Sequence, residues 1–191
     1  MTQIIPKHLI KDMPSIAYTG KTIIVTNAED AEIASEELMQ EDIFGFDTET
    51  KPVFVSGKSN SIAIIQIASS EKVYIFHVKR FPIKGKFKEF LESPKYLKVG
   101  VAIRDDVKKI YKYHKVQTEA SFDLTVLSKE RGILEAGLRT LTARVFGRKI
   151  SKRQQLSNWD NFPLSESQII YAATDAWLCR ELYFELQNCK P

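Results

Sequence analysis

Cysteine and histidine are scarce in this chain of 191 residues, which contains two cysteines and three histidines. Cys179 and Cys189 both lie near the C-terminal end, so the sequence offers neither a disulfide framework nor a Cys/His metal spacing. We expect both thiols to be reduced. His8, His77 and His114 are far apart and share no motif, so we expect structural or surface roles for them and no catalytic base among them.

Long apolar runs and internal repeats are also missing. No segment approaches the roughly 20 apolar residues that span a bilayer, and the first residues lack the apolar core of a signal peptide. Hydrophobic residues make up 43% of the chain and charged residues 27%, which is typical of a globular protein. Without a linker or low-complexity tract, the sequence predicts a single domain over residues 1–191, no membrane contact and a cytoplasmic location.

Acidic residues are absent from residues 138–153, although the net charge of the chain is only +4. This stretch carries six basic residues, Arg139, Arg144, Arg148, Lys149, Lys152 and Arg153. Four lysines form a second cluster, Lys108, Lys109, Lys112 and Lys115. Either cluster could be a solvated helix face, but beside an acidic metal site such basic walls suit an anionic polymer.

Hydrophobic periodicity predicts an antiparallel start followed by alternating strands and helices. The predicted strands cover residues 16–26 (one long strand or a pair), 42–49, 61–69, 72–78 and 96–101, with 61–69 and 72–78 forming an antiparallel hairpin. The predicted helices cover residues 28–40, 85–91, 104–114, 122–131, 138–146 and 165–187, with Asn27 and Ser165 as expected N-caps. Residues 151–163 are expected to form a polar loop. This order predicts an α/β fold, a mixed sheet flanked by helices with a helical C-terminal part.

Carboxylates stand inside otherwise apolar segments at three places. Asp47 and Glu49 are two residues apart on a predicted strand, so both project to one face. Tyr171 and Asp175 are four residues apart on a predicted helix and therefore share a face. Asp106 lies at the first turn of a helix that follows an apolar strand. Because an unpaired buried anion costs several kcal/mol, roughly, a pair of divalent cations is the simplest explanation for this set.

Each placement also has a purely structural alternative. Asp47 and Glu49 could form an outward-facing acidic strand edge. Tyr171 and Asp175 could be a buried aromatic and a surface acid on one helix, and Asp106 could be stabilised by the helix dipole alone. The functional hypothesis therefore rests on the combination of the three placements.

Taken together, the motifs resemble the DEDD superfamily of 3′→5′ exonucleases, in the tyrosine-bearing (DEDDy) branch that includes ribonuclease D and the Werner-syndrome exonuclease domain. Asp47 and Glu49 match the first motif, Asp-x-Glu; Asp106 matches the second, after Gly-x-x-Ile-x-x-Asp; Tyr171 and Asp175 match the third, Tyr-x-x-x-Asp. Residues 156–159 (Leu-Ser-Asn-Trp) and 162–164 (Phe-Pro-Leu) are similar to the Werner-type group. The resemblance covers residues 25–187.

This resemblance implies a ribonuclease H-like fold that holds two divalent ions, Mg²⁺ or Mn²⁺. Asp47, Glu49, Asp106 and Asp175 would be the metal ligands, with Asp47 shared by both ions and Asp106 on the second ion. Tyr171 would orient the attacking water rather than act as a base, because a phenol with a pKa near 10 is a poor base at neutral pH. The expected catalytic residues are therefore these four carboxylates and Tyr171.

Two departures from the family pattern affect these assignments. Asp105 directly precedes Asp106, and we assign the second motif to Asp106 because its spacing from Gly100 and Ile110 fits the family frame. Residues 50–52, Thr-Lys-Pro, replace the aromatic residue that follows the first motif in the Werner-type group. The second departure bears on substrate preference more than on chemistry.

Predicted substrate contacts are polar or basic residues near these motifs. They are Thr48, Thr50, Arg148, Lys152, Arg153, Gln155 and Asn158. Trp159 is expected to be a core anchor rather than a stacking platform.

The sequence thus predicts a 3′→5′ exonuclease that releases nucleoside 5′-monophosphates from single-stranded or frayed 3′ ends, with DNA somewhat favoured over RNA. Three alternatives stay open: an RNA-trimming enzyme similar to ribonuclease D, a nucleic-acid-binding module without turnover, and an enzyme for small nucleotides. Protein partners are not indicated by any motif.

Overall fold

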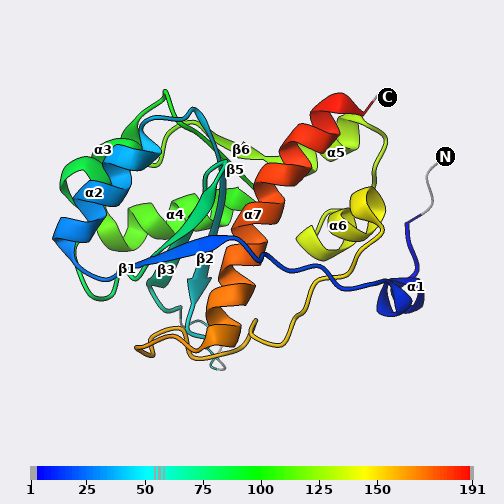
Figure 1. Ribbon diagram of the computed structural model, residues 1–191, viewed down its shortest axis with the longest axis horizontal. Coiled ribbons are helices and arrows are strands. Elements are labelled where there is room, and N and C mark those ends of the chain that lie inside the picture. The colour runs from blue at the N-terminus through cyan, green and yellow to red at the C-terminus, as the bar shows by residue number, and fades with distance from the viewer. Residues whose placement is uncertain (1–3, 54, 56, 58, 190–191) are drawn as a thin grey trace.

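A mixed sheet of six strands forms the centre of the molecule within residues 4–53, 55, 57 and 59–189, which the computed structural model describes. Its strand order is β1-β4-β3-β2-β5-β6 (Figure 1). The strands are β1 (Lys21–Val25), β2 (Ile43–Thr50), β3 (Ile62–Ala68), β4 (Lys72–Phe76), β5 (Leu97–Gly100) and β6 (Ser121–Asp123). β3 pairs antiparallel with β2 and β4, and the remaining pairs are parallel. The predicted hairpin and mixed sheet are confirmed.

Helices cover both faces of this sheet. They are α1 (Lys7–Asp12), α2 (Ala28–Leu38), α3 (Gly85–Glu92), α4 (Ile103–His114), α5 (Leu124–Glu130), α6 (Leu138–Phe146) and α7 (Glu166–Asn188). Figure 1 shows the long helix α7 crossing the sheet, with α2 and α3 together on one side and α6 and α1 on the other. In the described residues, no helix has the length and apolarity needed to cross a bilayer.

The core divides along the sheet because β2 and β3 are buried on both faces. Phe44 and Phe46 of β2 pack with α2, α3 and α4. The opposite face, with Ile64 of β3, packs against Ala172 of α7. A strand that is apolar on both faces reads as a continuous hydrophobic run, which is why β3 shows no polar alternation.

Small residues let helix α7 approach strand β2 unusually closely. A Cβ atom added at Gly45 would lie 1.9 Å from the carbonyl oxygen of Ala176 and 2.8 Å from the backbone nitrogen of Arg180. Only glycine therefore fits at this point of β2. The contact fixes α7 directly above the strand that carries Asp47 and Glu49.

Local capping explains where the best predicted helices begin. The Asn27 side chain accepts a hydrogen bond from the Asp30 backbone N–H at 2.9 Å, at the start of α2. Ser165 and Gln168 form a reciprocal capping box at the start of α7. Both predicted N-caps are confirmed.

Two predictions about local structure are wrong, and one helix was not predicted. Residues 16–26 are not one long strand or a strand pair, because β1 covers only Lys21–Val25 and the Tyr18 N–H bonds the Thr174 hydroxyl of α7 instead of a strand neighbour. The helix expected over 122–131 begins at Leu124, because Ser121–Asp123 pairs with β5 as strand β6. Helix α1 was not expected at all.

Candidate active site

Strand β2 and helix α7 bring three carboxylates together. Asp47 and Glu49 come from β2, and Asp175 comes from α7. One oxygen of each of these three side chains lies within 4.8 Å of the other two. Segments more than 120 residues apart in the sequence thus form one anionic cluster, as the combination of motifs and the family resemblance imply.

Tyr171 stands one helical turn before Asp175 on the same face of α7. Its ring lies 5.9 Å from the ring of Trp159, centroid to centroid, and Trp159 is fully buried. The prediction that Trp159 is a core anchor is confirmed. Since Trp159 packs beside Tyr171, the aromatic core limits the positions that the Tyr171 hydroxyl can take.

Asp106 approaches the cluster from helix α4, on the other side of β2. The Thr48 hydroxyl donates a hydrogen bond to Asp106 Oδ1 at 2.5 Å. Asp105, by contrast, has a side chain that is 79% exposed and pairs with Lys108 at 3.5 Å. Asp106 raises the pKa of Asp47 and of Glu49 by electrostatic repulsion, so it is close enough to act on both, although it lies outside the 4.8 Å group.

Burial disfavours the charged form of every acid in this set, and repulsion from the other acids adds to it at Asp47 and Glu49. Burial raises the pKa of Asp47 well above its usual range, and the neighbouring carboxylates add to that effect. Burial, followed by repulsion from Asp175 and Asp106, raises the pKa of Glu49 to about 9.

The other two acids follow the same direction. Burial raises the pKa of Asp175 to about 7, against the opposing effect of a hydrogen bond with Tyr171. Burial also raises the pKa of Asp106, against the hydrogen bond from Thr48. Without cations, a cluster of this kind holds protons at neutral pH; bound cations would displace them.

The cluster opens onto a cavity of about 410 Å³. The residues of β2 and α7 that line it are Asp47, Thr48, Glu49, Tyr171, Asp175 and Cys179. A second cavity, of about 230 Å³, shares Ile150, Ser151, Tyr171 and Asp175 with the first. None of the three histidines lines either cavity.

The predicted substrate contacts fall into two groups. Thr48, Lys152 and Gln155 line the first cavity, and Arg153 lines the second. Thr50, Arg148 and Asn158 line neither of these two cavities; the Asn158 side chain is occupied with Asn161 at 2.8 Å.

Several lining residues were not among the predicted site residues. Lys7 and Ile10 come from α1, and Arg139 and Thr140 come from the first turn of α6. The basic stretch 138–153 contained a signal for Arg139. Nothing in the sequence near Lys7 pointed to the site, because α1 reaches it only through tertiary contacts.

Comparison with known proteins gives one family. A family described as 3′–5′ exonuclease matches residues 22–189. The bifunctional 3′–5′ exonuclease/ATP-dependent helicase WRN of Mus musculus is 32% identical over 197 aligned residues, which cover 96% of this chain and 14% of that protein. The human exonuclease mut-7 homolog is 28% identical, over 74% of this chain and 19% of its own length. The chain therefore spans only a small part of these two relatives.

Solved structures agree on the fold. The EXO domain of Aedes aegypti Nibbler superimposes with a TM-score of 0.82 at 22% identity, covering 91% of both chains. Escherichia coli RNase D superimposes with a TM-score of 0.76 at 19% identity, covering 87% of this chain and 45% of its own. These neighbours are ribonuclease H-like exonuclease domains, which confirms the expected fold.

Proposed function

The chain belongs to the 3′–5′ exonuclease family, and from this premise we propose that it hydrolyses nucleic acid from the 3′ end with the help of two divalent metal ions. The products would be nucleoside 5′-monophosphates, and the substrates single-stranded or frayed 3′ ends. One observation carries the proposal: carboxylate oxygens of Asp47, Glu49 and Asp175 lie within 4.8 Å of one another beside a cavity. Buried carboxylates held this close together destabilise the folded protein unless cations compensate their charge.

The donor set fits Mg²⁺ or Mn²⁺. Hard divalent cations prefer oxygen ligands, and the cluster offers carboxylate oxygens that are held close together by β2 and α7. Asp47, Glu49 and Asp175 would hold one ion, and Asp47 with Asp106 the other. Burial and the neighbouring carboxylates raise the pKa of Glu49 to about 9, so a cation that binds there would displace its proton.

Two ions bound there would lower the pKa of the attacking water and stabilise the charge on the leaving 3′ oxygen. The chain's own residues supply position. Burial raises the pKa of Tyr171 further above its ordinary value, so its hydroxyl stays protonated and orients water by hydrogen bonding. Attack on phosphorus then forms the new P–O bond as the P–O3′ bond breaks.

Thr48 is a positioning residue in this scheme. Its hydroxyl donates to Asp106 at 2.5 Å and so fixes the direction of that carboxylate. Because the Thr48 hydroxyl proton is already donated to Asp106, Thr48 could contact the substrate only through its backbone or through the lone pairs of its hydroxyl oxygen.

Lys152, Arg153 and Gln155 are the proposed phosphate and sugar contacts, because they line the two cavities next to the carboxylates. Thr50, Arg148 and Asn158 remain predictions for nucleotides farther from the cleaved bond. The salt dependence of oligonucleotide binding tests the three cations among them, and the dissociation constants of Ala variants test the three uncharged residues.

We propose DNA as the somewhat favoured substrate, because the motifs at 156–159 and 162–164 are of the Werner type. RNA is the second candidate. It is supported by the structural likeness to RNase D, described as an exoribonuclease involved in structured RNA processing, and to a Trypanosoma brucei RNase D in complex with RNA U12.

A degradation assay tests both points. We would incubate 5′-labelled single-stranded DNA and RNA of one sequence with the protein in Mg²⁺, in Mn²⁺ or in chelator, beside an Asp47→Asn variant. A ladder shortened from the 3′ end in metal only, and absent in the variant, is expected. Metal-independent cleavage, or binding of both polymers with no cleavage, would refute the proposal; the second result would favour a non-catalytic binding module. Degradation of dinucleotides alone would instead indicate an enzyme for small nucleotides.

A further inference from the structure

Residues 4–20, here called the N-terminal arm, lie before the part of the chain that matches the exonuclease family, residues 22–189. The arm is nevertheless joined to the fold by specific contacts. The Ile5 N–H donates to Glu135 Oε1 at 3.0 Å, and Glu135 has a side chain that is only 1% exposed. Arg144 donates to the same carboxylate at 2.7 Å, so Glu135 links the arm to helix α6.

Backbone pairing fixes the second half of the arm. The Lys149 N–H donates to the Pro14 carbonyl, and the Ile16 N–H donates to the Lys149 carbonyl, both at 3.0 Å. These bonds make a short parallel bridge between the arm and the segment that follows α6. Figure 1 shows α1 beside α6, at the end of the molecule away from α2 and α3.

This anchoring brings one turn of α1 to the cavity that holds the carboxylates. Ile10 is 1% exposed and lines that cavity, so α1 is tied to the cavity wall by a buried side chain. Lys7, one turn earlier, also lines the cavity and is exposed. The arm therefore places a cation at the rim of the candidate active site.

Lys7 has two companions. Arg139 and Lys152 line the same cavity, and none of the three forms an ion pair with any residue of the described ranges. The Nε of Arg139 is buried and has no hydrogen-bond partner there. These three cations lack acidic partners and are therefore available to bind phosphates. Bound metal would neutralise the neighbouring acids, so a phosphodiester chain could pass from the rim to the carboxylate cluster.

We propose that Lys7 contacts the polynucleotide backbone at a phosphate on the 5′ side of the phosphate being cleaved, and so makes binding depend on polymer length. This inference rests on the proposed function. The cleaved phosphate belongs at the carboxylate cluster, whereas Lys7 is an exposed residue in the lining of the same cavity. In a strand that is shortened from its 3′ end, the remaining phosphates lie on the 5′ side of the cleaved one. The arm then contributes a substrate contact that the family-matched region does not contain.

A binding experiment tests the proposal whether or not the protein cleaves. The variant is Lys7→Gln, and the matched control is Lys11→Gln, which removes the same charge from the same helix at a residue that does not line the cavity. Fluorescence anisotropy with a labelled 12-nucleotide single strand, in chelator and over a salt series, reports the dissociation constant and its salt slope. We expect Lys7→Gln to weaken binding about three- to tenfold and to lower the slope by about 0.7, the value for one lost contact to a single strand.

The control outcomes separate the possibilities. Lys11→Gln should bind within about twofold of the wild type, since a remote exposed charge is screened at moderate salt. Lys7→Arg should restore binding, because it keeps the charge. Equal losses in the two Gln variants would overturn the proposal, because they would show a non-specific charge effect. Failure of the wild type to bind any oligonucleotide would overturn the proposal and the proposed function together.

A catalytic comparison tests the position of the contact. With Mn²⁺, KM for the 12-nucleotide strand should rise in Lys7→Gln by the same factor as the dissociation constant, while kcat changes little. Turnover of thymidine 5′-monophosphate p-nitrophenyl ester, which has a single phosphate, should be unchanged. An equal loss on this ester would refute the assignment to an upstream phosphate. If the wild type binds strands but cleaves neither substrate, the proposed function fails, and the binding test still decides the role of Lys7.

Discussion

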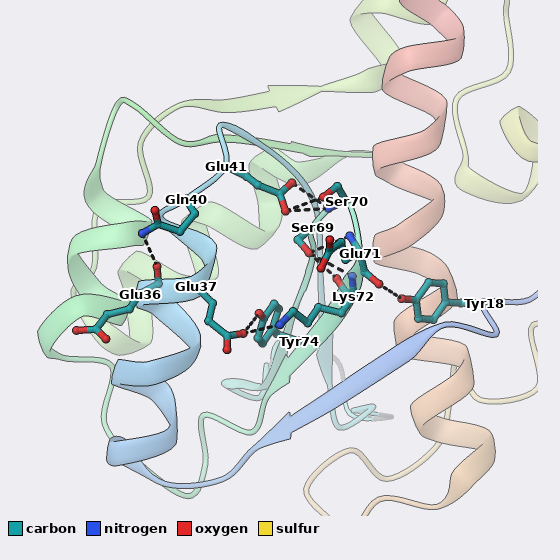
Figure 2. A network of polar contacts seen from close by, with 10 residues as sticks. All are labelled: Tyr18, Glu36, Glu37, Gln40, Glu41, Ser69, Ser70, Glu71, Lys72 and Tyr74. Carbon is teal, nitrogen blue, oxygen red and sulfur yellow. Dashed lines mark hydrogen bonds and ion pairs between the residues drawn. The ribbon is translucent and has the colours of Figure 1, made fainter.

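Two groups of acids beside the same sheet have opposite surroundings. Near the start of β4, Glu37 of α2 pairs with Lys72 at 2.7 Å and also accepts a hydrogen bond from Tyr74, as Figure 2 shows. Glu41 accepts from the backbone and the hydroxyl of Ser70 at 2.9 and 2.8 Å. At the end of β2, by contrast, Asp47, Glu49 and Asp175 face one another.

The pKa values follow from these surroundings. Hydrogen bonds from Lys72 and Tyr74 lower the pKa of Glu37, whereas burial and neighbouring anions raise the pKa of Glu49 to about 9. The first arrangement stabilises the fold and the second destabilises it in the absence of cations. Acids that lie next to other acids, rather than next to cations or hydrogen-bond donors, therefore mark the part of this molecule that is organised for binding.

The largest effect is expected for Asp47→Asn, which keeps the shape of the side chain and removes one charge from the cluster. The rate of hydrolysis should fall by at least about 1,000-fold, because removing any one residue of a catalytic unit abolishes nearly the whole activity. The thermal midpoint of the metal-free protein should nevertheless rise, since repulsion is relieved. Exonuclease rates and thermal unfolding in chelator measure the two effects. A variant that is both inactive and less stable would contradict the comparison.

Tyr171→Phe should have a smaller effect on activity. The change removes a hydroxyl that orients water and leaves every carboxylate in place. We therefore expect the catalytic rate to fall about 10- to 100-fold, which is less than the loss of most general acids or bases causes. The rate with saturating Mn²⁺ measures it. Residual rates equal to those of Asp47→Asn would show that Tyr171 does more than orient water.

The stability of the protein should respond to pH in opposite ways at the two places. Glu49, whose pKa is raised to about 9, and Asp175, raised to about 7, favour the folded state at low pH; their contribution is lost as pH rises through those values. Glu37, whose pKa is lowered, stabilises the fold above its ordinary pKa, and this contribution is lost as pH falls.

In chelator we therefore expect the thermal midpoint to decrease as the pH is raised from 5 to 9. Mn²⁺ at about 100 times its dissociation constant should add roughly 2.7 kcal/mol of stability. At one fixed Mn²⁺ concentration, the shift should be larger at pH 8 than at pH 5.5, because proton competition raises the dissociation constant at the lower pH. Thermal scans with and without Mn²⁺ at the two pH values give the result. A metal shift independent of pH would argue against binding at these acids.

The smallest effect is expected for Glu37→Gln in the network of Figure 2. The Lys72–Glu37 pair is partly exposed, with side chains 21% and 45% accessible, so its loss should cost at most about 1 kcal/mol of unfolding free energy. Exonuclease activity should stay within about twofold of the wild type, since the pair lies away from the cavity lining. Urea unfolding and the degradation assay are the two measurements. A large loss of activity would remove the distinction between the two regions.

Elements with strong local signals could be predicted from the sequence. The capping box at Ser165 and Gln168 defines the start of α7 without reference to the rest of the fold. The apolar run of β3 and the short connection to β4 define the hairpin. Helix α1 has six residues and no side-chain cap, and β6 has three residues, so both depend on tertiary contacts that local patterns do not contain.

The candidate site shows the same division. Alternation along β2 predicted that Asp47 and Glu49 face one way, and the helical spacing predicted that Tyr171 and Asp175 share a face. The spacing from Gly100 and Ile110 favoured Asp106 over Asp105, and the Thr48 hydrogen bond to Asp106 and the exposure of Asp105 support that choice. Lys7 could not be found from the sequence, because its place at the cavity depends on the contact between Ile5 and Glu135, 130 residues apart.

The central claim is that acids from β2, α4 and α7 together hold divalent ions at one point. Anomalous diffraction at the manganese edge, from crystals soaked in Mn²⁺, tests it most directly. We predict two peaks, both in contact with Asp47, one shared with Glu49 and Asp175 and the other on the side of Asp106. No anomalous density between these carboxylates at saturating Mn²⁺ would contradict the account.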